Sequence, residues 1–151
     1  MPLIEMTTII DAPIDRCFDL ARSIDLHKLS TEGTGEEAIA GVTWGLIEKG
    51  QKVTWRASHF GIRQTLSSRI TEFDRPYHFR DEMIKGVFKM ISHDHVFEPL
   101  QNKTIMHDRF RFESPGGMLG VWFNNICLTR YLRKLLMKRN AIIKETAESN
   151  H

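Results

Sequence analysis

The chain has 151 residues, of which 41% are hydrophobic and 26% charged, and its 21 Lys and Arg against 19 Asp and Glu give a formal net charge of +2. This length is sufficient to bury a substantial core and predicts a single domain over residues 1–151. The nearly balanced charge argues against a nucleic-acid-binding protein, because such proteins gather positive charge on one surface. The basic run at 130–138 is more typical of the solvated face of a helix.

The N-terminal residues include an acid at Glu5 and contain no apolar run, so we expect no signal peptide. No stretch of the sequence approaches the length of a membrane-spanning helix. The two cysteines, Cys17 and Cys127, fall in predicted helices without a paired spacing, which favours a reduced protein in which both are core residues. We therefore expect a cytoplasmic protein without nucleic acid or a membrane among its partners.

The first elements are a strand and two short helices. Leu3–Asp11 alternates and is rich in Thr and Ile, which predicts a strand. Pro13 stands where a first helical turn begins, and the apolar residues from Ile14 to Ala21 follow with helical spacing. A second short helical turn is predicted over Ile24–Leu29, and two glycines then break the pattern within Ser30–Gly35.

The middle of the chain is a series of strand-like runs separated by turn residues. The runs are Glu36–Ala40, Lys52–Phe60, Ile62–Phe73, Tyr77–Ile84, Phe88–Phe97 and Thr104–Phe112. Glycine, proline, Asp and Asn mark the breaks between them, and no break has room for a crossover helix. The pattern therefore predicts an antiparallel meander.

The last segment, Pro115–Glu148, is predicted as one long helix. One face is apolar along its length, whereas Leu119, Phe123 and Ile126 lie on the opposite face of its first half, so both sides of that half should be covered. These elements predict an α+β fold in which a seven-stranded curved antiparallel sheet wraps around the long C-terminal helix, with two short helices after strand one.

Several segments resemble a known superfamily. They are VTWRASHFG at 53–61, FRDEM at 79–83, HDHVF at 93–97 and DRFRF at 108–112 leading into PGG at 115–117. In these segments and in element order the chain resembles the START-related helix-grip (SRPBCC) superfamily, in particular its bacterial polyketide cyclase/dehydrase-like and lipid-transport-like members. The resemblance implies a cavity between the sheet and the C-terminal helix that binds hydrophobic or amphipathic small molecules. It implies no particular reaction, because function varies widely on this scaffold.

Strand alternation predicts which side chains face the helix. The inward sets combine apolar residues, including Tyr77, with five titratable ones. The candidate ligand-binding residues, which include two from the helix, are Trp55, His59, Asp81, His93, His95, Asp108, Phe110, Trp122 and Asn125. The exposed loop residue Trp44 could close a cavity mouth or touch a partner.

Three interpretations of the inward His and Asp side chains remain open. They could be hydrogen-bonded core residues, because buried polar groups need partners, or the polar end of a ligand pocket. They could also form a cupin-like metal site in which His93 and His95 act with Glu98. A cupin should also supply a third His from a later, glycine-marked strand, whereas here the chain enters a long helix after Glu113, so we expect no metal and no other cofactor.

No nucleophile motif and no phosphate-binding glycine motif occurs in the sequence. We therefore expect a protein that binds a small hydrophobic or amphipathic molecule. The alternative is a cyclase- or dehydratase-type enzyme that uses the inward His and Asp as general acid and base, with no particular catalytic residue assigned. Arg139, at the centre of the apolar helix face, is predicted to pair with an acid of strand one or of the early helix.

Overall fold

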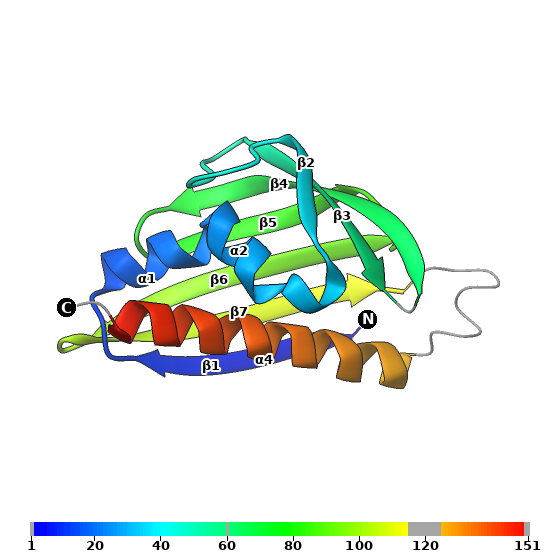
Figure 1. Ribbon diagram of the computed structural model, residues 1–151. Coiled ribbons are helices and arrows are strands. Elements are labelled where there is room, and N and C mark those ends of the chain that lie inside the picture. The colour runs from blue at the N-terminus through cyan, green and yellow to red at the C-terminus, as the bar shows by residue number, and fades with distance from the viewer. Residues whose placement is uncertain (1, 60, 115–124, 150–151) are drawn as a thin grey trace.

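A computed structural model describes residues 2–59, 61–114 and 125–149 and contains, within those ranges, a seven-stranded sheet and a long C-terminal helix (Figure 1). The elements in chain order are β1 (Leu3–Ile10), α1 (Ile14–Ala21), α2 (Ile24–Ser30), the short 3₁₀ helix η1 (Glu32–Thr34), β2 (Glu37–Gly41), β3 (Lys52–His59), β4 (Ile62–Asp74), β5 (His78–Lys85), β6 (Met90–Leu100), β7 (Lys103–Glu113) and α4 (Asn125–Ser149). The predicted fold class is confirmed, because every predicted strand and both short helices are present.

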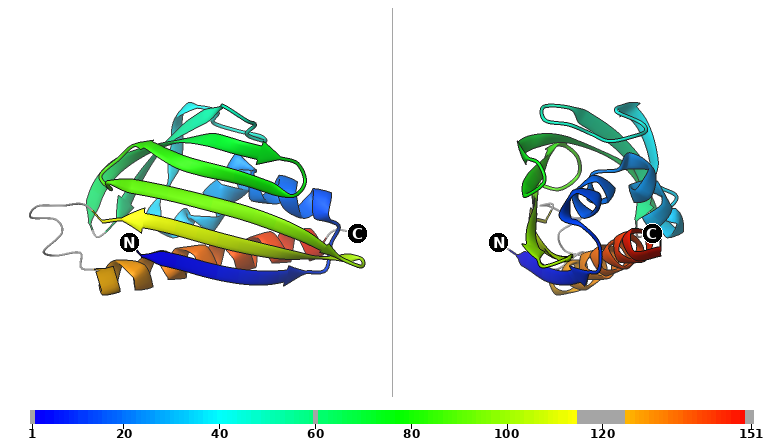
Figure 2. Two further views of the ribbon diagram at one scale, coloured as in Figure 1. Left: turned by 180° about the vertical axis from the view of Figure 1, so that it is seen from behind. Right: turned by 90° about the vertical axis from the view of Figure 1, so that its left-hand side faces the viewer.

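The sheet is antiparallel and has the strand order β1-β7-β6-β5-β4-β3-β2. Strands β2 to β7 lie beside their neighbours in sequence, which short turns allow, and β1 pairs with β7 at the far side. The register shifts within β2 and twice within β4, and such bulges bend a sheet. The sheet consequently curves around the helices, as the end-on view in Figure 2 shows.

Helix α1 fills the concave side of the sheet where Phe18 is buried among three aromatic rings. The rings of Phe73, Phe79 and Phe97 meet the Phe18 ring edge-on at centroid distances of 5.4, 5.2 and 5.4 Å. Aromatic pairs favour this arrangement over face-to-face stacking. A second cluster joins β1, β7 and α4 through Ile4, Phe112, Leu128 and Leu136. The two clusters hold α1 and α4 against the same face of the sheet.

The C-terminal end of α4 is anchored by hydrogen bonds to the start of the chain. Arg16 of α1 donates to the carbonyl oxygens of Thr146 and Ala147, each at 3.0 Å. Lys144 donates to the carbonyl of Ile9 at 2.7 Å. The last carbonyls of a helix have no backbone partner within the helix, so Arg16 satisfies the Ala147 carbonyl and adds to the hydrogen bond that the Ser149 hydroxyl donates to the Thr146 carbonyl at 3.2 Å.

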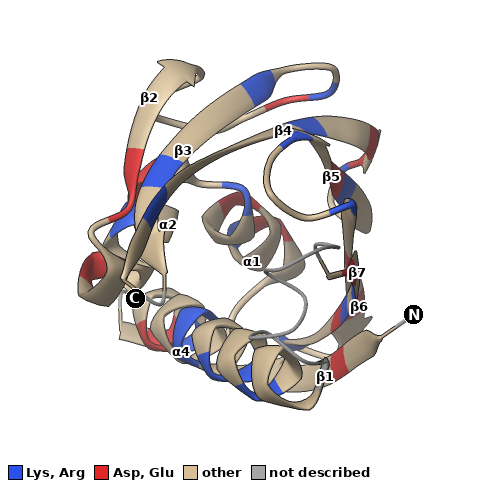
Figure 3. Cartoon of the chain, turned by 90° about the vertical axis from the view of Figure 1, so that its right-hand side faces the viewer, with Lys and Arg blue, Asp and Glu red and all other residues tan. Residues whose placement is uncertain are grey.

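The outer side of α4 faces solvent. Arg130, Arg133, Lys134 and Lys138 are exposed, and Figure 3 shows the basic residues of this helix from the end at which it begins. None of the helices in the described residues has an apolar stretch long enough to cross a membrane.

Some predictions about single residues are wrong. Cys127 is exposed rather than buried. Ile126 is 70% exposed, so the described sheet covers only one side of the helix there. Tyr77 is 51% exposed because it lies in the turn before β5, where strand alternation has not yet begun. The first part of the predicted long helix, residues 115–124, lies outside the described residues.

Candidate functional site

A pocket of about 280 Å³ lies between the concave face of the sheet and helices α2 and α4. Strands β3, β4, β5 and β6 supply its floor, and the first half of α4 supplies one side through Leu128, Leu132, Leu135 and Leu136. Most of the wall is apolar. The histidines and carboxyl groups that line it fall into two groups.

The first polar group follows from the register of the three central strands. Asp81 on β5 pairs with His93 on β6, and His95, two residues further along β6, pairs with Asp108 on β7. Side chains two residues apart on a strand point to the same face. All four side chains are therefore brought together on the concave face by backbone pairing alone.

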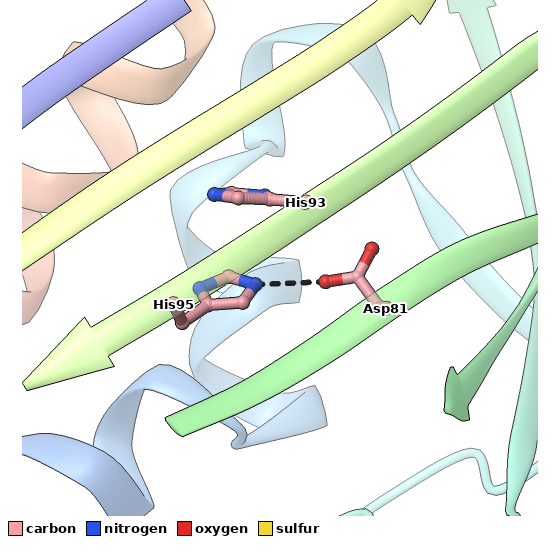
Figure 4. A group of neighbouring side chains, drawn as sticks. All are labelled: Asp81, His93 and His95. Carbon is pink, nitrogen blue, oxygen red and sulfur yellow. Dashed lines mark hydrogen bonds and ion pairs between the residues drawn. The ribbon is translucent and has the colours of Figure 1, made fainter. Parts of the chain in front are cut away.

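His95 is held between an acid and a guanidinium group. Its Nε2 lies 2.8 Å from Oδ2 of Asp81 (Figure 4), and its Nδ1 lies 3.2 Å from Nη2 of Arg139. A guanidinium group can only donate, so Nδ1 accepts and the proton resides on Nε2, which donates to Asp81. Burial, the neighbouring His93 and the charge of Arg139 lower the pKa of His95 well below its ordinary value. His95 is thus a neutral side chain with one fixed tautomer.

Asp108 supports this group from behind. It is 1% exposed and does not line the pocket. Its carboxylate accepts hydrogen bonds from Nε2 of His93 at 2.8 Å and from Nδ2 of Asn140 at 2.7 Å, and Nη1 of Arg139 lies 3.5 Å away. Burial alone would raise the pKa of Asp108, but the hydrogen bond and charge of His93 and the charge of Arg139 outweigh it and hold that pKa well below its usual range.

Asp81, in contrast, faces the pocket, and 28% of its side-chain surface is accessible. One carboxylate oxygen receives the hydrogen bond from His95, and the other points away from that ring in Figure 4. Burial raises the pKa of Asp81 despite the nearby His93 and Arg139. We refer to Asp81, His93 and His95 as the polar floor. It offers an oriented carboxylate and two imidazole rings to an otherwise apolar space.

The polar floor also has the side-chain types of a metal site, since Asp81, His93 and His95 can each place one ligand atom within 4.8 Å of the others. The surroundings do not fit this role. A metal on Nε2 of His95 would move the proton to Nδ1, which would then face the Arg139 donor at 3.2 Å. The predicted partner Glu98 is on the outer face, 3.2 Å from His107. The cupin-like ligand set is therefore wrong in its third member.

A second polar group combines residues from four elements, and we call it the Glu36 group: His27, Glu36, His59 and Tyr131. Nε2 of His27 donates to Oε1 of Glu36 at 2.9 Å, and Nδ1 of His59 is hydrogen-bonded to the Tyr131 hydroxyl at 2.6 Å. All four line the pocket, and the His27 ring lies 4.4 Å from the Trp55 ring.

The charges of the Glu36 group are set by burial and by its own members. Burial alone would raise the pKa of Glu36, but the hydrogen bond and charge of His27, with His59 nearby, lower it below the ordinary value. Burial lowers the pKa of His59. Burial and the adjacent carboxylate raise the pKa of Tyr131. Near neutral pH this group consequently contains a carboxylate, a neutral His59 and a protonated phenol.

The structure brings most of the sequence-predicted site residues to one pocket. Those that line it are Trp55, His59, Asp81, His93, His95 and Phe110. Asp108 lies behind the wall, Trp122 is outside the described residues, and the side chain of Asn125 is likewise not described. Trp44 is 75% exposed and does not line the pocket.

Sequence reasoning missed three members of the Glu36 group, and it assigned the wrong partner to Arg139. His27, Glu36 and Tyr131 come from a helix, a loop and a distant helix, so no strand alternation connects them. Arg139 meets Asp108 of β7 rather than an acid of strand one or the early helix, and α1 contributes only the Ala21 carbonyl at 3.2 Å. Asp108, which strand alternation predicted to face inward, was the sequence signal that could have identified the partner of Arg139.

Comparison with known proteins identifies the fold by shape. No family model matches the sequence, and no curated protein matches it. Among solved structures, TTHA0849 from Thermus thermophilus is similar with a TM-score of 0.73 at 18% identity, covering 97% of this chain and 100% of that one. A START superfamily protein from Mycobacterium smegmatis has a TM-score of 0.73 at 9% identity, covering 97% of both chains. The major latex-like protein 151 from Panax ginseng has a TM-score of 0.69 at 17% identity and also covers 97% of both.

The chain therefore has the helix-grip fold, with a pocket between the sheet and the C-terminal helix. In these comparisons 97% of the chain aligns with a START superfamily protein and with a major latex-like protein, and the fold is the one that the sequence resemblance implied. At these identities the similarity defines the fold, and the function must be argued from the site itself.

Proposed function

We propose that the protein binds a small hydrophobic or amphipathic molecule in the pocket, with the polar floor orienting the polar end of that molecule. The observation that supports this proposal is the contrast between the mostly apolar pocket wall and the three side chains of the polar floor. An apolar cavity with a few convergent polar groups is typical of small-molecule sites. His95 and Asp81 are fixed in orientation before any guest arrives, since Arg139 sets the tautomer of one and a hydrogen bond fixes the other.

The proposal is tested with the neutral fluorophore N-phenylnaphthylamine, whose emission rises in apolar surroundings. Ala57 is buried and lines the pocket, whereas its neighbour Ser58 is exposed on the opposite face. Ala57→Leu should fill part of the cavity and weaken binding of the fluorophore, and Ser58→Leu is the matched control. Equal binding by both variants, or no binding by the unmodified protein, would contradict the proposal.

The orienting role of the polar floor is tested with a second variant and its matched control. Asp81→Asn removes the charge of a pocket-lining acid, and Glu82→Gln makes the same change on the next residue, which does not line the pocket. One hydrogen bond is worth about 1 kcal/mol, so Asp81→Asn should weaken a hydroxyl-bearing competitor several-fold. Native mass spectrometry of the protein from its own host would then identify a co-purifying guest.

A second candidate function is acid–base catalysis of the cyclase or dehydratase type. Asp81 favours it, because burial raises the pKa of this pocket-facing carboxyl group, and an acid–base catalyst must accept and return a proton. The two candidates are separated by recovering the co-purified molecule after prolonged incubation with fresh protein. An unchanged mass and chromatographic position support binding alone, and conversion that Asp81→Asn abolishes supports catalysis.

A further inference from the structure

Two guanidinium groups and two carboxyl groups line the pocket, and the two kinds of group differ in their partners. Two guanidinium groups line the pocket, those of Arg22 and Arg139. Each is paired with a carboxylate that does not line it: Arg22 lies 2.9 Å from Asp19, and Arg139 lies 3.5 Å from Asp108. Both positive charges are therefore compensated from behind the wall.

The two acids that do line the pocket have no such partner. In the described residues, Glu36 and Asp81 are the lining carboxylates, and neither lies within 4.0 Å of an Arg or Lys nitrogen. Each has an imidazole as its charged or polar partner, His27 for Glu36 and His95 for Asp81. A guest thus meets two carboxylates, and the neutral His95 offers no charge to offset one of them.

The surroundings of Glu36 suit a cation. Trp55 and Tyr131 line the same part of the pocket wall. The His27 and Trp55 rings lie 4.4 Å apart, and the Tyr131 hydroxyl is hydrogen-bonded to His59. Aromatic faces attract ammonium groups, most strongly when water is excluded. Among the described residues, the Glu36 carboxylate accepts hydrogen bonds from His27 at 2.9 Å and, more weakly, from the Thr34 hydroxyl at 3.4 Å, and a carboxylate can accept more than two.

We propose that the Glu36 group is a subsite for a positively charged amino group, so that the pocket takes an amphipathic amine in preference to a carboxylate such as a fatty acid. This inference rests on the proposed binding function and names the chemical class of the guest. The ammonium group of the guest donates to Glu36, its apolar part occupies the space between β3 and α4, and the polar floor remains available to a second donor such as a hydroxyl group.

The test compares decylamine, decanol and decanoic acid as competitors of N-phenylnaphthylamine. These three molecules each have ten carbons in an unbranched chain and differ in the head group, which is cationic, neutral or anionic. At about pH 8 decylamine is cationic, decanoic acid is anionic, and Glu36, whose pKa is lowered, is a carboxylate. We expect decylamine to compete best and decanoic acid least, with at least about a tenfold difference between them, as for a charge-assisted hydrogen bond.

The matched variants are Glu36→Gln and Glu37→Gln. Glu36→Gln keeps the shape of the side chain and an oxygen for His27, whereas Glu37 is exposed and paired with Arg56 at 2.9 Å. We expect Glu36→Gln to abolish the preference for decylamine while N-phenylnaphthylamine still binds, and Glu37→Gln to retain it. Thermal melting of both variants confirms that each is folded.

Two results would overturn the subsite alone, and a third would overturn the proposed binding function together with it. Equal competition by amine and acid in the unmodified protein would show that the pocket does not select by charge. A preference that survives in Glu36→Gln but is lost in Asp81→Asn would place the amino group at the polar floor. Failure of N-phenylnaphthylamine to bind the unmodified protein at all would instead refute the binding function itself.

Discussion

Replacing Asp108 by Asn should destabilise the protein far more than its single lost charge suggests. The carboxylate accepts from His93 and Asn140 and compensates Arg139, and no part of its side chain is exposed. An Asn side chain has one accepting oxygen, so its amide nitrogen would face a donor, either His93 or Asn140. Arg139 would remain as a buried cation that has lost its acid.

Removing one member of a buried ion pair costs about 3–5 kcal/mol. For a domain of this length each kcal/mol lowers the melting temperature by about 2–4 °C, so the expected fall is on the order of 10 °C. Differential scanning calorimetry measures it directly. Glu37→Gln, which breaks the exposed pair with Arg56, is the control and should cost less than about 1 kcal/mol.

A second variant checks the cause of that loss. Adding Arg139→Met to Asp108→Asn removes the uncompensated cation and should restore part of the stability, because an apolar side chain can replace a buried charge without penalty. The reasoning fails if Asp108→Asn destabilises no more than Glu37→Gln, or if the double variant is less stable than the single one.

Three further outcomes are expected. In the unfolded chain His95 takes up a proton near pH 6.5, whereas in the folded protein its pKa is lowered and it stays neutral. The free energy of unfolding should therefore fall below that pH by up to about 1.4 kcal/mol per pH unit. In urea titrations His95→Gln should show a shallower fall. Gly41→Ala should cost about 2 kcal/mol or more, because φ is 73° and the new Cβ would lie 2.2 Å from the Lys52 carbonyl oxygen; Gly45→Ala, at a φ of 78° with open space, should cost about 1 kcal/mol. Elemental analysis should find no stoichiometric zinc, iron or manganese, and one metal per chain lost on His93→Ala would contradict the argument from Arg139.

The order and type of the elements could be predicted because each is encoded locally. Two-residue alternation marks the strands, and it also placed His93, His95, Asp81 and Asp108 on the concave face. Alternation does not define depth, however. It could not tell that Asp81 borders the pocket whereas Asp108 is sealed behind it, since both sit at equivalent positions of their strands.

Contacts between distant elements were beyond local reasoning. Glu36 follows η1, and its neighbours come from α2, β3 and α4, so the Glu36 group exists only once the sheet has closed around the helices. Exposure of Ile126 was missed for the same reason, because an apolar side chain in a helix does not reveal whether the fold supplies a surface to cover it.

The final turns of helix α4, which do not border the pocket, are hydrogen-bonded to the start of the chain. Arg16 and Lys144 hold its final turns, while Leu132 and Leu135, two turns and more away, form part of the wall. Changes in side-chain size at Leu132 or Leu135 can therefore reshape the pocket while the hydrogen bonds made by Arg16 and Lys144 stay in place. For protein engineering, this separation means that point substitutions on the pocket side of α4 can be used to change which molecules the pocket accepts. The hydrogen bonds of the last turns would remain unchanged.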